Sequence, residues 1–310
     1  MKSHDRDVIV SALRHAAPYI RLYKKKIFVL KAGGEVFTSE EATRNLLEQV
    51  ALLHQVGIRV VLVHGGGPQS TELANALGVP TRMVGGRRVT DKQTLDVTTM
   101  VLNGKINTRI LAACRDLHLP AVGISGVDAG LIKAHKRPPV TVEGHAGGPV
   151  DFGFVGDIDA VNTDVVQAQL DNGFVPIVSP LSADDNGTVL NINADTVAAA
   201  LATALRASKL ILTMGAPGIL QDRHDPSSLV SYLDLDDLQE LRTNGSLAEG
   251  MLPKAQAIEA AIKGGVPRVH LISYKVPDSL LLEIFTNEGT GTLVVEDTDT
   301  LTPEEQEAGA

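Results

Sequence analysis

The chain has 310 residues, 44% of them hydrophobic but only 3% aromatic, and it contains no Trp. A core of Val, Ile, Leu and Ala is typical of an α/β sheet covered by helices, and the length allows a large one. A formal net charge of -9 argues against nucleic acid as the main partner. The single cysteine, Cys114, excludes an internal disulfide and a cysteine zinc site, and its apolar neighbours predict packing in a helix. Without a signal-peptide pattern or an apolar run of membrane length, we expect a cytoplasmic protein that does not enter a membrane.

Hydrophobic periodicity predicts strands and helices in alternation along the chain. The first helix is expected over 7–22, where Pro18 should end or kink it. Strands are expected at 27–31, 59–63, 120–124, 174–178, 209–213, 267–272 and 291–295. The helices expected between them are 39–56, 68–77, 91–118, 160–172, 194–206, 252–264 and 277–286. This order predicts an α/β fold with an open, mainly parallel β-sheet sandwiched between helices and an extra N-terminal helix.

Two regions interrupt this alternation. The stretch 125–155 is rich in Gly, Pro, Val and Thr, which predicts hairpins or a lid at the edge of the sheet. The polar turn 182–187 is the best boundary between two lobes. The acidic, polar tail after Glu296 is expected to fray.

Two glycine-rich turns each end a hydrophobic run. The first is Lys31-Ala32-Gly33-Gly34, and the second runs from His64 through Gly65, Gly66 and Gly67 to Pro68. Glycines at the carboxyl end of a strand let backbone N–H groups approach an anion closely, and Pro68 suits the first turn of a helix. The pair therefore predicts a phosphate held between two loops, although the sequence has neither a P-loop nor a dinucleotide fingerprint.

Charged residues near these turns have both a functional and an ordinary interpretation. Lys31 would place its ammonium beside any phosphate on the first turn, whereas a lysine at a strand end is usually only solvated. His64 could be a base or a metal ligand, but we favour a role in bracing the glycine turn by hydrogen bonds. Lys254 occupies the first turn of a helix, where the helix dipole disfavours a cation unless it serves an anion.

Further polar residues lie at two other predicted helix starts. In Gly86-Arg87-Arg88-Val89-Thr90-Asp91, one arginine could clamp a carboxylate through its planar fork, or both could be surface residues. Asp195, which ends Asn191-Ile192-Asn193-Ala194-Asp195, could be an ordinary N-cap. If Asp195 instead faces Lys31, its charge would hold that lysine in place and keep it ionised.

Taken together, these motifs resemble the amino acid kinase family, and within it the members that phosphorylate N-acetyl-L-glutamate in arginine biosynthesis. The resemblance runs from about Pro18 to Val295. It is carried by the motifs described above, in the same order, together with Ser125-Gly126-Val127-Asp128. Each motif is modest alone, but the ordered set is specific.

The resemblance implies a role for each matching residue. Lys31 and Lys254 would stabilise the transferring phosphoryl group, and Asp195 would orient both lysines. Backbone N–H groups of the two turns would bind the phosphoryl oxygens and the substrate, and Arg88 and Asn191 would bind the acceptor near its α-carboxylate. The residues implied for phosphate are Gly33, Gly34 and Gly65, and those implied for substrate are Gly66, Gly67, Arg88 and Asn191.

The implied reaction is transfer of a phosphoryl group from ATP, with Mg²⁺, to the side-chain carboxylate of N-acetyl-L-glutamate. That carboxylate is ionised at pH 7, so no general base is required, and positioning with electrostatic stabilisation should supply the catalysis. No protein side chain is expected to bind the metal directly. The implied division is an N-terminal helix over 1–25, an acceptor lobe over 26–183, a nucleotide lobe over 184–296 and a polar tail over 297–310.

The two ends of the chain resemble the arginine-inhibited members of the family. The resemblance implies that arginine binds between the first helix and the C-terminal segment, at Tyr19 and Glu283. It also implies a homo-oligomer, a dimer or a hexamer in which the extra helix links dimers. The alternative is that this helix packs only on its own subunit.

Two other functions stay open from the sequence. The fold could act on a different carboxylate acceptor, although Arg88 and Asn191 favour a free, amino-acid-like one. Alternatively, the chain could be a weakly active, arginine-sensing paralogue, because Met214 stands where the family usually has an aspartate near the nucleotide. Retention of Lys31, Asp195 and Lys254 argues against that second alternative.

Overall fold

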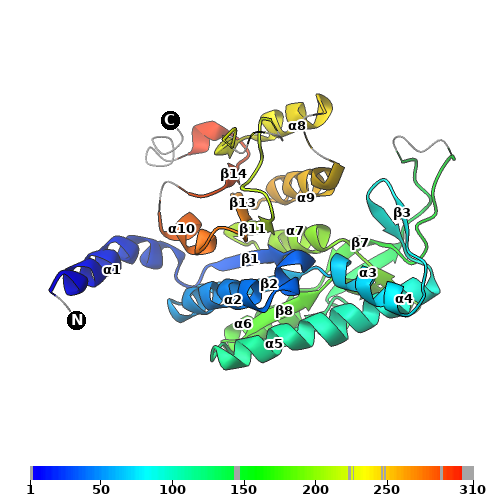
Figure 1. Ribbon diagram of the computed structural model, residues 1–310, viewed down its shortest axis with the longest axis horizontal. Helices are drawn as coiled ribbons and strands as arrows, with labels where there is room; N and C mark the ends of the chain where they lie inside the picture. The colour runs from blue at the N-terminus through cyan, green and yellow to red at the C-terminus, as the bar shows by residue number, and fades with distance from the viewer. Residues whose placement is uncertain are drawn as a thin grey trace.

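The computed structural model describes residues 3–142, 147–222, 225, 227–245, 247, 249–286 and 289–301. An eight-stranded sheet forms its centre, in the order β12-β14-β13-β11-β1-β2-β8-β5 (Figure 1). Its strands are β1 Ile27–Ala32, β2 Arg59–His64, β5 Ala121–Ser125, β8 Val175–Ser179, β11 Lys209–Met214, β12 Tyr232–Leu233, β13 Val269–Ser273 and β14 Thr292–Val294. All neighbours pair in parallel except β13 and β14, which are antiparallel. The predicted open, mainly parallel sheet is therefore confirmed.

Helices cover both faces of this sheet because its strands are apolar on both sides. Val29 and Val61 pack into one core cluster with helices α6 Asp164–Asp171, α7 Ala194–Ala204 and α9 Leu252–Lys263. Phe28 and Leu62 point to the opposite face and pack with α2 Glu40–Gln55, α5 Asn107–Asp116 and α10 Ser279–Phe285. Cys114 lies fully buried in α5, and burial raises the pKa of its thiol to about 12, so the predicted packing role is confirmed.

The other helices match the expected positions with one correction and one addition. The helix expected over 91–118 is present as one helical run, made of α4 Lys92–Thr99, the π-helical η2 Met100–Ile106 and α5. The helix expected over 68–77 is α3, Gly67–Ala76. Helix α1, Ser3–Tyr23, continues through Pro18, so the prediction that the helix could end at this proline is wrong. A proline removes one hydrogen bond, to the carbonyl of Arg14, and water can solvate that carbonyl on this exposed helix. Helix α8, Leu235–Thr243, was not expected, although Asp234 and Asp237 form a capping box at its start.

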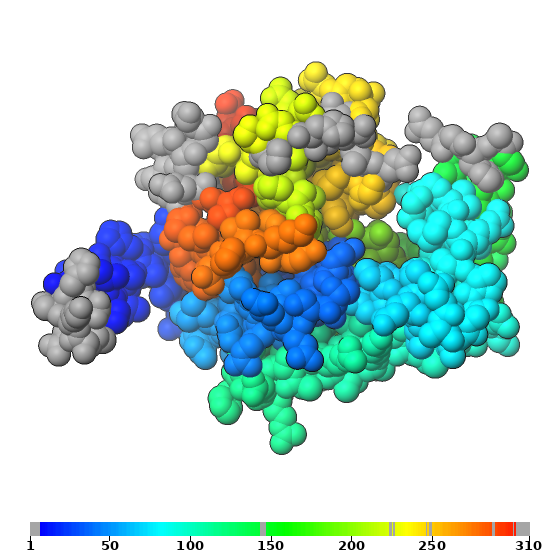
Figure 2. All heavy atoms as spheres, viewed as in Figure 1, coloured from blue at the N-terminus to red at the C-terminus, as the bar shows by residue number. Residues whose placement is uncertain are grey.

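Helix α1 projects from the body of the molecule beside α10 (Figures 1 and 2). Its exposed apolar side chains include Ile9 and Leu13. Among the described residues, no helix combines the length and the apolar character that crossing a bilayer requires.

A second sheet forms in the region that interrupts the alternation. It has the order β10-β9-β6-β7, with β6 Ile132–Lys136, β7 Gly156–Val161, β9 Leu181–Ala183 and β10 Val189–Asn191. Within 125–155, Val140 and Val150 form an antiparallel bridge. Strands β6 and β7 also pair antiparallel, but β7 lies after this region and includes Ala160 and Val161, which were expected to begin a helix, so α6 starts only at Asp164. Residues 143–146 of this region, and residues 302–310 of the expected frayed tail, lie outside the described residues. The turn of 184–187 joins β9 to β10, and the division into lobes stays a prediction.

A short hairpin stands beside this second sheet. Its strands are β3 Arg82–Val84 and β4 Arg87–Val89. In Figure 2 the surface is notched between the cyan segment that carries this hairpin and the gold segment that carries α9. The hairpin and α9 therefore stand on two sides of one opening.

Candidate functional site

The two glycine turns lie side by side because β1 and β2 are adjacent parallel strands. Ala32 and His64 are register partners, and Gly65 N donates to Ala32 O at 2.8 Å. A Cβ on Gly34 would lie only 2.9 Å from the Cα of Gly66, so the two backbones touch without room for side chains. The predicted meeting of the turns is confirmed, and it leaves their backbone groups lining a cavity.

Helix α3 begins at the second turn. Gly66 is its N-cap, without any side-chain cap hydrogen bond, and Pro68 stands in the first turn as expected. The first N–H groups of a helix lack internal partners and carry positive partial charge. This end of the cavity can therefore accept an anion on backbone donors.

Gln69 supports the first turn and was missed by sequence reasoning. Its Nε2 donates to Gly34 O at 2.7 Å, across 35 positions of the chain. The side chain is buried, and its Oε1 has no partner among the described residues. Nothing in the local pattern distinguishes this glutamine from an ordinary helix residue, because its partner, Gly34, lies in the turn after β1, far away in the sequence.

His64 braces the second turn. Its Nε2 accepts a hydrogen bond from Asn107 Nδ2 at 3.2 Å, so the Nδ1 hydrogen is left to donate to Gly65 O at 3.1 Å. Burial lowers the pKa of His64 to about 4, partly opposed by that bond to Gly65. The imidazole is neutral, fully buried and occupied at both nitrogens, as the bracing role requires and a base or metal ligand would not be.

Lys31 and Lys254, 223 positions apart in the sequence, share the carboxylate of Asp195. The ammonium of Lys31 lies 2.9 Å from Asp195 Oδ1, and that of Lys254 lies 3.0 Å from Oδ2. The side chains are 7% exposed for Lys31 and Asp195 and 17% for Lys254. Strand β1, helix α7 and helix α9 each contribute one member of this group, which we call the lysine–aspartate cluster.

The charges of the lysine–aspartate cluster do not cancel. Burial by itself would raise the pKa of Asp195, but the two ammonium groups outweigh it and hold that pKa below its ordinary value. Burial and the charge of Lys31 lower the pKa of Lys254, and Asp195 opposes this. Two cations around one anion leave a net positive charge beside the glycine turns, which suits a polyanionic ligand.

Asp195 is not the N-cap of its helix, so that interpretation is wrong. Asn193 caps α7, since its side chain accepts from Asp195 N at 2.8 Å and from Thr196 N at 3.2 Å. The carboxylate of Asp195 is thereby free to face the lysines. An Asn two residues earlier is itself a strong N-cap signal that the sequence contained.

Arg88 and Asn191 lie on the other side of the same cavity. The guanidinium of Arg88 donates to Thr71 Oγ1 at 2.6 Å and to Thr81 Oγ1 at 3.1 Å, and contacts Gly67 O at 3.3 Å. No carboxylate pairs with it among the described residues, and burial lowers its pKa. Asn191 Nδ2 donates to Thr90 Oγ1 at 3.4 Å. Both residues can therefore contribute donors to a ligand that carries a carboxylate.

The cavity joins these parts in one volume of about 440 Å³. Thr213, Met214 and Gly215, at the end of β11, line it together with the lysine–aspartate cluster. Ten of the twelve predicted site residues line this cavity: Lys31, Gly33, Gly34, Gly65, Gly66, Gly67, Arg88, Asn191, Asp195 and Lys254. Among the described residues, no three His, Cys, Asp or Glu side chains converge as a metal site would need.

Tyr19 and Glu283, the other two, lie together in a separate small cavity of about 60 Å³. Tyr19 meets Phe285 of α10 edge to face, with ring centroids 6.5 Å apart. Glu283 Oε1 accepts from His270 Nδ1 at 2.7 Å and its Oε2 from Thr290 N at 2.8 Å. Sequence reasoning missed His270 and also Lys209, whose Nζ donates to His270 Nε2 at 2.8 Å. We call Lys209, His270 and Glu283 the lysine–histidine–glutamate cluster.

Burial sets the charge state of this second cluster. Burial, together with the charge of Lys209, lowers the pKa of His270, although Glu283 opposes the shift. Burial would raise the pKa of Glu283, but His270, Thr290 N–H and Lys209 outweigh it and lower that pKa. The cluster is therefore a lysine and a glutamate carboxylate joined by a neutral imidazole.

Comparison with known proteins supplies the family. The model of the amino acid kinase family matches residues 26–273. Over 288 residues the chain is 51% identical to the acetylglutamate kinase of Myxococcus xanthus, covering 92% of this chain and 94% of that protein.

Solved structures of N-acetylglutamate synthase from Neisseria gonorrhoeae are also similar. The complex with coenzyme A and N-acetyl-glutamate has a TM-score of 0.80 at 29% identity, and that with coenzyme A and L-arginine has 0.79 at 28%. Each alignment covers 93% of this chain, which spans only 64% and 65% of the synthase chains. From its fold, its sequence over most of its length and its match to the family model, the chain belongs to the amino acid kinase family.

Proposed function

We propose that the cavity transfers the γ-phosphoryl group of ATP to the side-chain carboxylate of N-acetyl-L-glutamate, in arginine biosynthesis. The chain acts as an acetylglutamate kinase, like the protein with which it shares 51% of its residues over nearly the whole of both chains. The observation that carries this function is the lysine–aspartate cluster, which holds Lys31 and Lys254 within 3.0 Å of Asp195 beside the two glycine turns.

The catalytic problem is to bring one anion against another. The acceptor carboxylate is the nucleophile and is already ionised, since its pKa is about 4.3 in solution, so no base is needed. Lys31 and Lys254 stabilise the charge on the transferring phosphoryl oxygens, and Asp195 holds both ammonium groups in place. N–H groups of Gly33 and Gly34 bind those oxygens from the backbone. Gly65 lines the same wall of the cavity, but its own N–H is already bonded to Ala32 O at 2.8 Å, so the implied phosphate contact from that N–H is corrected.

The acceptor is held at the Arg88 side of the cavity. Arg88 pairs with its α-carboxylate, for which a planar fork of donors is well suited. Asn191 donates to the same part of the acceptor, and the N–H groups of Gly66 and Gly67 complete its site. The nucleotide occupies the side near Met214, so residues 26–183 form the acceptor lobe and residues 184–296 the nucleotide lobe.

Mg²⁺ fits this site as part of the nucleotide. The one buried carboxylate at the phosphate end, Asp195, is already bonded to two lysines, and the described residues offer no cluster of ligands. We propose that Mg²⁺ would be held by the nucleotide and not by a protein side chain, and that it would supply neutralisation of phosphate charge beside Lys31 and Lys254.

Arginine is proposed as an effector at the second cavity. Glu283 offers a buried carboxylate for a guanidinium, and Tyr19 brings α1 to the same place. The similar synthase that was crystallised with L-arginine supports this proposal. Control by arginine would link the product of the pathway to its kinase.

A homo-oligomer is proposed from helix α1. Val8, Ile9, Val10 and Leu13 are each between 48% and 63% exposed, an apolar surface that a second copy of the chain would cover. We propose a dimer, or a hexamer in which α1 (within residues 1–25) links dimers. Light scattering should report a smaller assembly for Leu13→Glu than for the natural chain, and equal masses would contradict the role of α1.

An acceptor panel tests the activity. The acyl phosphate is trapped with hydroxylamine, using ATP and N-acetyl-L-glutamate, N-acetylaspartate, glutamate or aminoadipate as acceptor. We expect the highest kcat/KM with N-acetyl-L-glutamate. A preference for another acceptor would favour the related-kinase alternative, and arginine binding without nucleotide binding would favour the sensing paralogue that Met214 suggests.

A further inference from the structure

The hairpin β3–β4 contacts both sides of the catalytic cavity through two consecutive arginines. Successive side chains of a strand point in opposite directions, so Arg87 and Arg88 cannot serve the same neighbour. Arg88 reaches Thr71 on α3, on the side proposed for the acceptor. Arg87 reaches across to α9, where its Nη2 donates to Gln256 Oε1 at 3.3 Å.

The bond from Arg87 ends close to the reacting groups. Gln256 lies two residues after Lys254 on α9, and both Arg87 and Gln256 line the cavity. Lys254 reaches Asp195 from the first turn of this same helix. Any movement of α9 away from the hairpin would therefore lengthen the Arg87–Gln256 bond and withdraw Lys254 from the cavity.

The surroundings of Arg87 make this bond breakable. The neighbouring Arg137 is held by Asp157 through three hydrogen bonds of 2.6 to 3.1 Å. For Arg87 the structure records no ion pair among the residues it describes, only the single bond to a neutral amide. A long bond between a guanidinium and an amide is weaker than a two-point ion pair, so it can open and re-form as ligands pass.

We propose that Arg87 is a positioning residue, whose bond to Gln256 fixes α9, and with it Lys254, over the acceptor side of the cavity. This inference rests on the proposed function, because it assigns Lys254 to the transferring phosphoryl group. It adds a contact that spans the opening and that neither the glycine turns nor the lysine–aspartate cluster provides.

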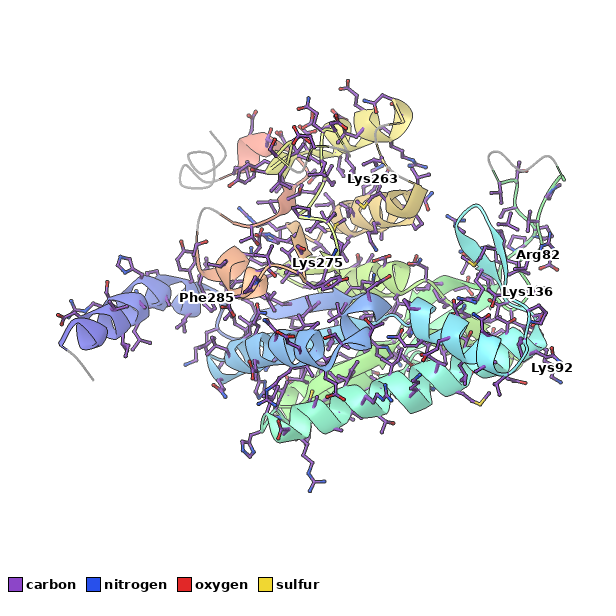
Figure 3. All side chains as sticks on the ribbon, viewed as in Figure 1. Arg82, Lys92, Lys136, Lys263, Lys275 and Phe285 are labelled. Atoms are coloured by element: carbon purple, nitrogen blue, oxygen red, sulfur yellow. The ribbon has the colours of Figure 1, made fainter. Side chains whose placement is uncertain are left out.

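A double-mutant cycle tests the inference. Arg87→Met and Gln256→Leu should each lower kcat about tenfold and leave both KM values within about twofold, because Lys254 is misplaced while Arg88 still binds the acceptor. The double variant should fall no further than the worse single variant, and Arg87→Lys should recover part of kcat. Arg82→Met removes an exposed arginine from the same hairpin (Figure 3) and should behave as the natural chain.

Several results would overturn it. They are an unchanged kcat in Arg87→Met, losses that simply multiply in the double variant, or a raised KM for the acceptor with kcat intact. Hydrogen exchange of α9 in the ligand-free chain tests the same bond without the reaction, and should be faster in Arg87→Met than in Arg82→Met. If the natural chain were inactive but the two variants still differed in exchange, the proposed function would be rejected and the role of the Arg87–Gln256 bond would stand. If the enzyme were active but the two variants exchanged equally, only the role of that bond would be rejected.

Discussion

Among the described residues, Asp195 and Glu283 both have buried carboxylates, and these are surrounded in opposite ways. Asp195 is bonded directly by two lysines and faces the cavity of about 440 Å³. Glu283 is bonded by the imidazole of His270 and a backbone N–H, and it faces the cavity of about 60 Å³. Lys209 bonds the other nitrogen of that imidazole.

This difference indicates that one α/β fold can select ligands of different charge through the side chains bonded to a buried carboxylate. The lysine–aspartate cluster has one cation more than its anion requires, so it favours a polyanion such as ATP next to an anionic acceptor. The lysine–histidine–glutamate cluster pairs one lysine with one carboxylate through an imidazole, and arginine is the ligand that we propose for it. Substitutions in each cluster test whether the two differ in this way.

Removal of a cation from the first cluster should have the largest effect. Lys31→Ala and Lys254→Ala should each lower kcat on the order of 10²–10³-fold, the loss expected when one donor to a transition-state oxyanion is removed. Hydroxamate trapping at saturating substrates measures kcat.

Lys263→Ala is the matched control for Lys254→Ala. It removes an exposed lysine from the far end of the same helix (Figure 3). Its kcat should equal that of the natural chain. If Lys254→Ala were as active as Lys263→Ala, the surplus cation would have no catalytic role and the contrast would fail.

A neutral residue in the second cluster should affect regulation by a smaller factor. Glu283→Gln keeps the shape of the side chain but removes the charge that a guanidinium needs, so half-inhibition should require about tenfold more arginine. Inhibition curves are measured relative to the uninhibited rate of each variant. An unchanged curve would mean that arginine does not bind at Glu283.

The smallest expected effect is on the pH dependence of the free energy of unfolding, which should differ between the two clusters. The pKa of His270 is lowered in the folded chain, so below its ordinary value of 6.5 the unfolded chain takes up a proton that the folded one resists. Stability from this group is therefore lost as the pH falls below about 6.5. The lowered pKa of Asp195 gives stability that is lost only as the pH falls below its ordinary value of 3.8.

Urea unfolding at pH 7.5, 6.0 and 5.0 measures this dependence. His270→Gln should lose less stability between pH 7.5 and 5.0 than the natural chain does. Asp195→Asn retains His270 and should still show the loss between pH 7.5 and 5.0. The contribution of His64 is common to all these chains, because its pKa of about 4 arises from burial and the bond to Gly65, and neither involves His270 or Asp195. A parallel fall in His270→Gln and the natural chain would show that His270 does not titrate as proposed.

Much of the fold could be predicted because the decisive signals are local. Apolar runs such as Ile27–Leu30 and Val60–Val63 are long enough to mark buried parallel strands, and the glycines after them mark the turns. The parallel order then brings the carboxyl ends of β1 and β2 together without further information. The prediction of a helix end at Pro18 was wrong because it also used a local rule. That rule does not take into account that water can solvate an exposed carbonyl at little cost.

Pairing between distant segments could not be predicted. Strand β7 ends with Ala160 and Val161, the residues expected to begin a helix, and only their pairing with β6 places them in a sheet. The lysine–aspartate cluster was anticipated through the family resemblance and as one of two interpretations of Asp195. Gln69, Lys209 and His270 gave no local sign of their partners, which come from other elements.

By itself, the sequence determined the α/β order, the two glycine turns and the residues able to contact a phosphate, because these follow from hydrophobic period and from single residue types. Tertiary structure alone decided which charges meet. It placed two lysines on Asp195 and an imidazole on Glu283, since β1, α7 and α9 meet at one cavity and β13 and α10 at the other only when the sheet is assembled. Burial strengthens these charge interactions, because charges that are removed from water interact strongly enough to influence which ligand charges each cavity can bind.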